Sequence, residues 1–289
     1  MTVERWFIDS ETGTLSDVLL CPPDFYTWNP SNDIAIRTLA SGARPDPVLL
    51  RQQFDGLVAL LEGAGVRCHF LTPQQGLPYQ VYTRDSSQTT PWGTVVTRLM
   101  RPERQPEAQS IEAFYGEDAI ISRCTEGFVE GGDIHVIRPG LLAVGVSGGR
   151  TTIEGAQAFM KPFEEAGWTC RMIHFPEHFL HLDVIFTMVT DDLAIGVVDV
   201  LEDEDLAWFE AQKIRILPVT YKEAMRDMGC NVLALGEGRV VSPAHSTRIN
   251  AMLRDHGLTV LDTPLDQFSQ GGGSIHCMTM PLRRASLKD

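Results

Sequence analysis

The segment with the clearest chemical potential is a triple glycine that leads to a cysteine. Residues 270–281 read Gln-Gly-Gly-Gly-Ser-Ile-His-Cys-Met-Thr-Met-Pro, which places a thiol at Cys277. Glycine is used where a backbone approaches another group closely or adopts positive φ. A thiolate held there could act as a nucleophile. A cysteine among apolar residues is also a common small core side chain, and a glycine-rich stretch is often a plain loop. Partners elsewhere in the chain must decide between these interpretations.

Three further segments carry the candidate partners. His181-Leu182-Asp183 begins a run typical of a buried strand, so the alternation of side chains predicts that His181 and Asp183 project from the same face. Glu130 precedes two glycines at the start of a second such run, and Asp85 ends a Tyr-Thr-Arg-Asp segment. Each segment taken alone is more typical of a surface turn or a hydrogen-bonded pair than of a catalytic group.

A repeated pattern of elements would position these residues. An amphipathic helical stretch, a helix-ending residue and a short β-type run recur, with junctions at residues 65, 116, 167, 212 and 257, which are 51, 51, 45 and 45 residues apart. Strand-like pairs lie between the later junctions, for example 132–137 with 141–145 and 184–189 with 193–198. Glycine ends helices in any α/β chain, but the even spacing favours five strand-strand-helix-strand units.

Five such units cannot bury their apolar faces separately. We therefore predict an α/β fold of five ββαβ units around a common centre, with helices outside and loops converging on an axial site. This arrangement predicts one domain over residues 1–289.

The composition excludes several classes of function. The chain has 289 residues, 24 Lys and Arg against 38 Asp and Glu, and a formal charge of −14, which disfavours binding to nucleic acid or to an anionic membrane surface. No apolar run approaches the ~18 residues of a membrane span, and residues 1–6 lack a leader pattern. The six cysteines are dispersed without a C-x-x-C pair, so we expect a reduced, cytoplasmic protein.

The motifs and the repeat together resemble the guanidine-modifying enzymes of the pentein superfamily, which include arginine deiminases, dimethylarginine dimethylaminohydrolases, agmatine deiminases and amidinotransferases. Tyr-Thr-Arg-Asp, Glu-Gly-Gly-Asp, His-x-Asp and Gly-Gly-Gly-x-x-His-Cys-Met-Thr occur in the family's order between residues 82 and 281. The resemblance implies a fold of five ββαβ blades with pseudo-fivefold symmetry, the pentein fold.

The resemblance also implies roles for the candidate residues. Cys277 is similar in position to the nucleophile and His181 to the general acid and base, with Glu130 supporting His181. Asp85 and Asp183 resemble the carboxylates that grip a guanidinium, a planar cation suited to paired oxygen acceptors. Arg104 and Arg150 resemble the arginines that hold a substrate carboxylate, although exposed arginines of no such role are common.

These roles imply a cofactor-independent, metal-free hydrolase that cleaves a guanidino C–N bond of arginine or an N-substituted arginine through a covalent thiouronium at Cys277. The products would be citrulline and ammonia or an amine. Two alternatives stay open on the same residues: an amidinotransferase with an amine acceptor, and an agmatine-type deiminase. The expected partner is a small guanidino compound rather than a nucleic acid or a membrane, and assembly into a homo-oligomer is left open.

Overall fold

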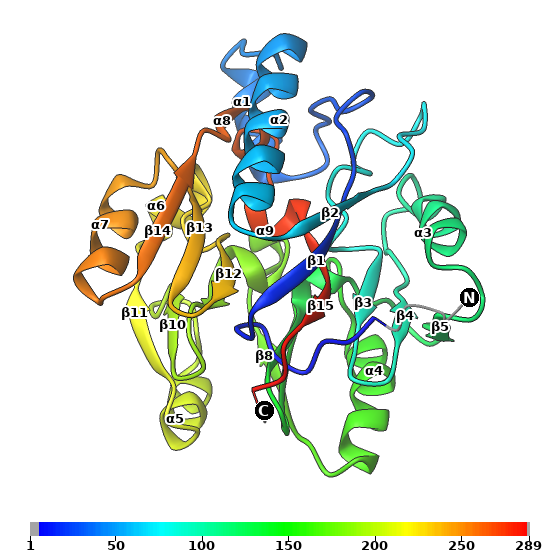
Figure 1. Cartoon of the computed structure of the whole chain (residues 1–289), viewed down its shortest axis with the longest axis vertical. Helices are drawn as coiled ribbons and strands as arrows, with labels where there is room; N and C mark the ends of the chain where they lie inside the picture. The colour runs from blue at the N-terminus through cyan, green and yellow to red at the C-terminus, as the bar shows by residue number, and fades with distance from the viewer. Residues whose placement is uncertain (1–5, 288–289) are drawn as a thin grey trace.

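The computed structural model describes residues 6–287, and these form five separate three-stranded sheets (Figure 1). In each sheet the central strand pairs antiparallel with one neighbour and parallel with the other. Four sheets are built from consecutive strands: β3 (Ser87–Thr89), β4 (Thr94–Val96) and β5 (Ile120–Arg123); β6 (Ile134–Arg138), β7 (Leu141–Val146) and β8 (Thr169–His174); β9 (Phe186–Met188), β10 (Leu193–Gly196) and β11 (Arg215–Pro218); β12 (Leu233–Gly236), β13 (Arg239–Pro243) and β14 (Thr259–Thr263).

The remaining sheet joins the two ends of the described chain. Its central strand β1 (Leu15–Leu20) pairs antiparallel with β15 (Met280–Arg284) and parallel with β2 (Arg67–Phe70). The segment directly after Cys277 is therefore held against the first strand of the protein, which closes the ring of sheets.

One longer helix crosses over between the two parallel strands of each unit and lies on the outside of the molecule (Figure 1). These helices are α2 (Pro47–Gly63), α3 (Glu107–Tyr115), α4 (Ile153–Glu165), α5 (Asp203–Ala211) and α7 (Thr247–Asp255). Each ends one or two residues before a predicted junction, which confirms the five-unit repeat. Glycine has positive φ at four of the junctions, and Lys213, with φ 60°, takes that conformation beside Gln212.

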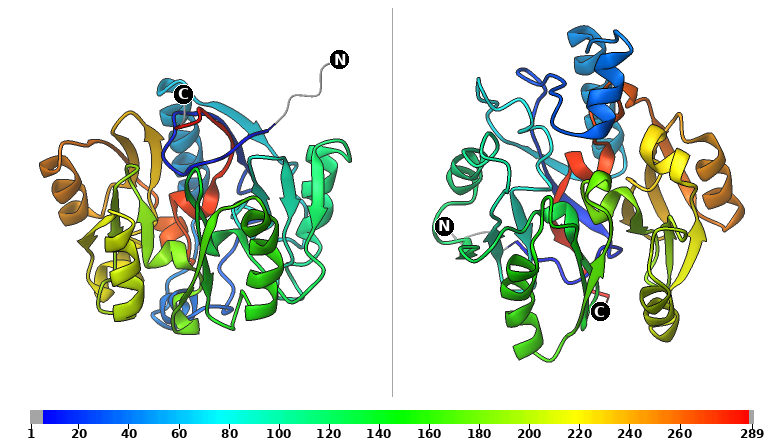
Figure 2. Two further views of the ribbon diagram at one scale, coloured as in Figure 1. Left: turned by 90° about the horizontal axis from the view of Figure 1, so that it is seen from below. Right: turned by 180° about the vertical axis from the view of Figure 1, so that it is seen from behind.

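The shorter helices are α1 (Asp33–Ala40), α6 (Tyr221–Asp227), α8 (Asp266–Ser269) and α9 (Ile275–Met278), with the 3₁₀ turns η1 (Gly131–Asp133), η2 (Glu177–Phe179) and η3 (Leu182–Val184). Of these, α1 lies within the unit of β1 and β2, and the others lie in the segments that join one sheet to the next. The α9 helix, which carries Cys277, lies near the centre of the molecule in all three views (Figures 1 and 2).

The structure corrects one prediction about local structure. The segment from His181 onward is not a strand: the N–H groups of Val184 and Ile185 donate to the carbonyls of His181 and Leu182, which closes the η3 turn before β9 begins at Phe186. The Asp133 carboxylate stabilises this turn by accepting from the Leu182 N–H at 2.8 Å. His181 and Asp183 therefore do not share a strand face, and the turn places them instead.

Within residues 6–287, no helix combines the length and the apolar character needed to cross a membrane. The prediction that a leader is absent from residues 1–6 falls almost entirely outside the described part of the chain. All six cysteines are free.

Candidate active site

A small cavity lies where loops of several units meet. It spans about 340 Å³, counting the part open to solvent. Its walls include five of the seven predicted site residues, and the other two, Glu130 and Asp183, contact these directly. The lining residues are Ser31, Asn32, Tyr79, Tyr82, Asp85, Arg104, Arg150, Leu180, His181, Gly272 and Cys277.

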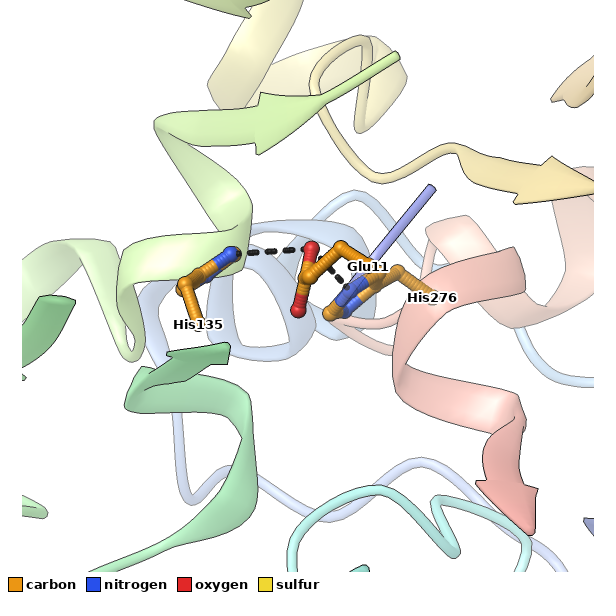
Figure 3. Close-up of side chains that lie close together, drawn as sticks. All are labelled: Glu11, His135 and His276. Atoms are coloured by element: carbon orange, nitrogen blue, oxygen red, sulfur yellow. Dashed lines mark hydrogen bonds and ion pairs between the residues drawn. The ribbon is translucent and has the colours of Figure 1, made fainter. Parts of the chain in front are cut away.

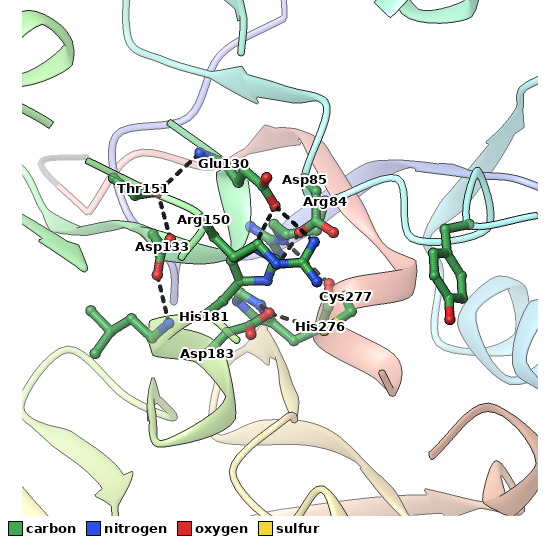
Figure 4. A network of polar contacts seen from close by, with 12 residues as sticks. Arg84, Asp85, Glu130, Asp133, Arg150, Thr151, His181, Asp183, His276 and Cys277 are labelled. Atoms are coloured by element: carbon green, nitrogen blue, oxygen red, sulfur yellow. Dashed lines mark hydrogen bonds and ion pairs between the residues drawn. The ribbon is translucent and has the colours of Figure 1, made fainter. Parts of the chain in front are cut away.

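Cys277 is buried at this cavity, with 4% of its surface exposed. Its Sγ donates to Asp183 Oδ2 at 3.3 Å and accepts from Asn231 Nδ2 at 3.1 Å (Figure 4 shows Cys277 with Asp183). Burial is the main reason that the pKa of the Cys277 thiol is raised well above its ordinary value, and the charges of Asp183 and Asp85 raise it further. Both effects favour the thiol over the thiolate.

The Thr-Arg-Asp motif holds the helix that carries this sulfur. Thr83 Oγ1 donates to the carbonyl of Met278 at 3.0 Å, and the backbone N–H of Arg84 donates to the carbonyl of Cys277 at 3.1 Å. The Arg84 Nε donates to the carbonyl of His276 at 3.3 Å. These bonds supply donors to the buried carbonyls at the end of a one-turn helix, whose last carbonyls have no partner within the helix itself.

His181 lies between two carboxyl groups. Its Nε2 is 2.7 Å from Glu130 Oε2, and its Nδ1 is 3.6 Å from Asp85 Oδ1 (Figure 4). Burial lowers the pKa of His181, but Asp85, Asp133 and Glu130 outweigh it and raise the pKa above its ordinary value. The imidazolium form, with a donor on each ring nitrogen, is favoured at neutral pH.

The Glu-Gly-Gly-Asp motif provides the room and the support for this imidazole. A Cβ on Gly132 would lie 2.8 Å from Cγ and Nδ1 of His181, so no larger residue fits there. Glu130 is fully buried and accepts from the Met100 N–H at 2.9 Å. Burial raises the pKa of Glu130, but the hydrogen bond and charge of His181 and the charges of the nearby arginines lower it below its usual range.

The two predicted carboxylate-binding arginines differ in their environment. Arg104 makes two hydrogen bonds to Glu107, at 2.8 and 2.9 Å, and one to Asp85 at 2.7 Å, so its guanidinium already pairs with protein carboxylates. Arg150 is 3.9 Å from Glu130 Oε2 and donates to the Ser31 carbonyl at 3.4 Å. Arg150 thus has the longer and weaker contacts of the two, and its guanidinium is the better placed to receive an additional anion.

A second buried cluster adjoins Asp183 and was not predicted from the sequence. His276 Nδ1 is 2.8 Å from Asp183 Oδ2, and His276 Nε2 is 3.7 Å from Glu11 Oε2. Glu11 also contacts His135 Nδ1 at 3.2 Å, and the two imidazole rings stack at 5.5 Å between centroids (Figure 3). Although burial raises the pKa of Glu11, the two histidines lower it well below its usual value. The cluster links Asp183, a neighbour of the sulfur, to the first loop of the described chain.

Within the described part of the chain, two groups of buried residues offer enough ligand atoms to hold a metal ion. They are Glu11 with His135 and His276, and Asp85 with Glu130 and His181. In both groups the members already pair with one another, and the buried guanidiniums of Arg84 and Arg284 act electrostatically on Glu11. A cation would have to compete with these positive groups. The absence of a catalytic metal stays a prediction.

The sequence comparisons identify the family. Residues 66–217 and 206–284 match the arginine deiminase family, and the chain belongs to this family. The chain is 29% identical over 279 residues to the uncharacterized protein YkgA of Bacillus subtilis. This match covers 95% of this chain and 94% of YkgA. It is also 31% identical over 249 residues to the arginine deiminase of Mycobacterium tuberculosis strain H37Rv. That match covers 73% of this chain and spans 62% of the mycobacterial protein.

Solved structures share the fold. The N-terminal domain of ArgZ, solved with a covalently bound reaction intermediate, has a TM-score of 0.78 over 93% of this chain and 98% of its own, at 19% identity. The dimethylarginine dimethylaminohydrolase from Pseudomonas aeruginosa has a TM-score of 0.74 over 92% and 99% of the two chains, also at 19% identity. The five-bladed α/β propeller of the pentein superfamily, predicted from the sequence, is thus the fold of this chain.

Proposed function

We propose that this protein is a hydrolase that cleaves a C–N bond in the guanidino group of arginine or an N-substituted arginine. One observation carries the proposal: a thiol, an imidazole paired with a carboxylate, and two further carboxyl groups converge on one small closed cavity. These groups are Cys277, His181 with Glu130, and Asp85 with Asp183. Membership of the arginine deiminase family supports the same class of substrate.

In the proposed complex the carboxyl groups of Asp85 and Asp183 bind the guanidinium. Both have one buried oxygen without a hydrogen-bond partner among the described residues, Oδ1 in each case. A buried acceptor left unpaired is costly, and guanidinium N–H groups would satisfy both. The bound cation would also offset the two negative charges that oppose ionisation of Cys277, so substrate binding itself would favour the thiolate.

The proposed reaction has two stages. The Cys277 sulfur attacks the central guanidino carbon, His181 gives its proton to the departing ammonia or amine, and an S-alkylthiouronium remains. Neutral His181 then takes a proton from water as the water attacks the same carbon. The C–S bond breaks, which releases the ureido product and restores both the sulfur and the imidazolium. Glu130 keeps His181 oriented in both stages.

Arg150 supports an amino-acid substrate over a decarboxylated one. It lies in the cavity wall with weak protein contacts, whereas the Arg104 guanidinium pairs with Glu107 and Asp85. We propose that the substrate carboxylate binds Arg150, and that Arg104 mainly orients Asp85.

Product analysis tests this function against amidino transfer, which would use the same residues. The enzyme is incubated with L-arginine alone and then with an acceptor amine such as glycine, and the products are identified by mass spectrometry. Citrulline and ammonia formed without acceptor would support hydrolysis. Ornithine that appears only when the acceptor is present would refute hydrolysis in favour of transfer.

A further inference from the structure

Asn231 is a buried polar residue that the motif-based roles leave unused. It lies between α6 and β12, has no exposed surface, and belongs to the otherwise apolar run Cys230–Leu235. All its side-chain polar atoms have partners in the catalytic segments. The Oδ1 accepts from the backbone N–H groups of Ser274 and Cys277, both at 3.2 Å, while Nδ2 donates to Cys277 Sγ at 3.1 Å and to the Asp183 carbonyl at 3.3 Å.

The chemistry of these partners fixes the orientation of the amide. Two backbone N–H groups on one side require the oxygen there, and the Asp183 carbonyl on the other side requires the NH₂ group. The group that faces the sulfur is therefore an N–H donor. A donor aimed at sulfur interacts weakly with a thiol and strongly with a thiolate, because hydrogen bonds to an ionised acceptor are stronger.

Most charged groups near the sulfur oppose its ionisation, so a donor that stabilises the thiolate would favour the reactive form. The carboxyl groups of Asp183 and Asp85 oppose ionisation of Cys277, and the hydroxyls of Tyr26 and Tyr82 lie close enough to interact with it electrostatically. Arg84 and a backbone hydrogen bond at Ser274 act in the opposite direction. His276 directly precedes Cys277 in the sequence and pairs with Asp183.

We propose that Asn231 is a catalytic residue of this site, whose Nδ2 stabilises the attacking Cys277 thiolate while Oδ1 fixes the helix that carries it. This inference rests on the proposed function. It assigns two separable tasks to one amide: the oxygen holds the backbone of α9, and the nitrogen acts on the reacting atom.

The test follows the reaction of Cys277 with 2-chloroacetamidine, a small cationic alkylating amidine. The rate of modification is measured between pH 5 and 10, and peptide mass spectrometry assigns it to Cys277. Asn231→Asp keeps an oxygen for the two backbone N–H groups but replaces the sulfur-facing donor with an oxygen. We expect the midpoint of its pH–rate profile to rise by about one pH unit or more, which makes alkylation about tenfold slower or worse at pH 7.

Asn250→Asp is the matched control for placing a new carboxyl group in the interior. Asn250 is 2% exposed in α7, where it accepts from Ser242 Oγ and donates to the Pro243 carbonyl, and none of these three residues lines the cavity. Its pH–rate profile should match the wild type. Asn231→Ser adds no charge, and its side chain is too short to reach the sulfur from the same backbone. It should raise the midpoint of the pH–rate profile as Asn231→Asp does. This variant replaces Asn231→Asp in the test if the aspartate variant does not fold.

The outcomes separate this inference from the proposed function. If wild-type Cys277 is not alkylated at any pH, the proposed function fails and this inference fails with it. The other outcome is that the wild type is alkylated but a folded Asn231 variant keeps the wild-type midpoint of the pH–rate profile and differs only in amplitude or melting temperature. Asn231 would then be a structural residue, and only this inference would be overturned.

Discussion

At the scale of single residues, the site balances charges so that each group has the protonation state its task needs. The neighbouring carboxyl groups raise the pKa of His181 and also the pKa of the Cys277 thiol, and the proposed mechanism needs a protonated His181 and a sulfur that ionises when the cationic substrate binds. This balance protects a buried sulfur from ionising without substrate. The carboxyl groups that act on these two residues belong to the predicted motifs, whereas four buried neighbours of the site carry no recognisable motif of their own: Glu11, Glu107, His135 and Asn231.

The first prediction at this scale concerns Arg150 and the substrate carboxylate. In Arg150→Ala the carboxylate of arginine would be left unpaired in a closed site, at a cost of about 2–4 kcal/mol in kcat/KM, or roughly 30- to 1000-fold. Agmatine lacks this carboxylate and should lose far less. Steady-state kinetics with both substrates provide the measurement. Equal losses, or a wild type that prefers agmatine, would contradict the carboxylate-binding role.

The second prediction at this scale concerns Asp133 and the pH dependence of folding stability. Burial raises the pKa of Asp133 from 3.8 to about 7, despite hydrogen bonds from Thr151 and Leu182. The folded protein therefore keeps a proton that the unfolded chain releases, so stability falls as pH rises from about 4 to about 7, by up to about 1.4 kcal/mol per pH unit. Asp133→Asn removes this titration and should lose less stability between pH 5 and pH 7 in urea unfolding. Identical pH dependence in both proteins would show that Asp133 ionises normally.

At the scale of elements, short turns rather than long strands and helices position the chemistry. Cys277 is on one turn of helix, and His181 and Asp183 flank the start of η3. The glycines of the motifs allow these turns to pack closely: Gly272 has φ 103°, and a Cβ there would lie 2.6 Å from Asn32 Oδ1.

Gly132→Ala tests this close packing. The added methyl group would meet His181 Cγ and Nδ1 at 2.8 Å and should displace the imidazole, with a fall in kcat of about 100-fold and a loss of stability of about 1–3 kcal/mol. Gly63→Ala, in open space at the end of α2, is the control and should retain full activity. The comparison needs kcat and urea unfolding for both variants; wild-type kcat in Gly132→Ala would refute the packing argument.

The sequence predicted the repeat better than the turns. Amphipathic helices and junction residues report local periodicity, so all five units were found from the pattern. The η3 turn was mistaken for a strand because Leu182, Val184 and Ile185 are apolar in either structure, and the deciding bond comes from Asp133, 49 positions away. Asn231 was missed for a similar reason: its contacts with Ser274 and Cys277 are distant in sequence, and a lone asparagine in an apolar run was the only local signal.

At the scale of the whole molecule, the fold depends on pairing the two ends of the described chain. The β15 strand begins at Met280, with two residues between it and Cys277, and pairs with β1. Its Leu282 is fully buried in a cluster with Trp6, Leu19, Val96 and Ile111, which lie before β1, in β1, in β4 and in α3. The position of Cys277 is thus coupled to the closure of the ring.

Leu282→Ala should therefore destabilise the whole protein by about 2–5 kcal/mol, the usual cost of a cavity in a core. Leu287→Ala makes the same substitution at a site that is 40% exposed and should change stability by no more than about 0.5 kcal/mol. Both values come from denaturant unfolding. Similar small effects for both leucines would mean that ring closure contributes little.

The most direct test of the central claim is whether arginine forms a covalent thiouronium on Cys277. Wild-type protein is mixed with L-arginine, quenched in acid within a single turnover and examined by intact and peptide mass spectrometry, with citrulline measured in parallel. The account predicts an adduct with the mass of arginine less ammonia on the peptide that contains Cys277, and neither adduct nor citrulline from folded Cys277→Ser. Citrulline produced at the wild-type rate by Cys277→Ser would contradict it.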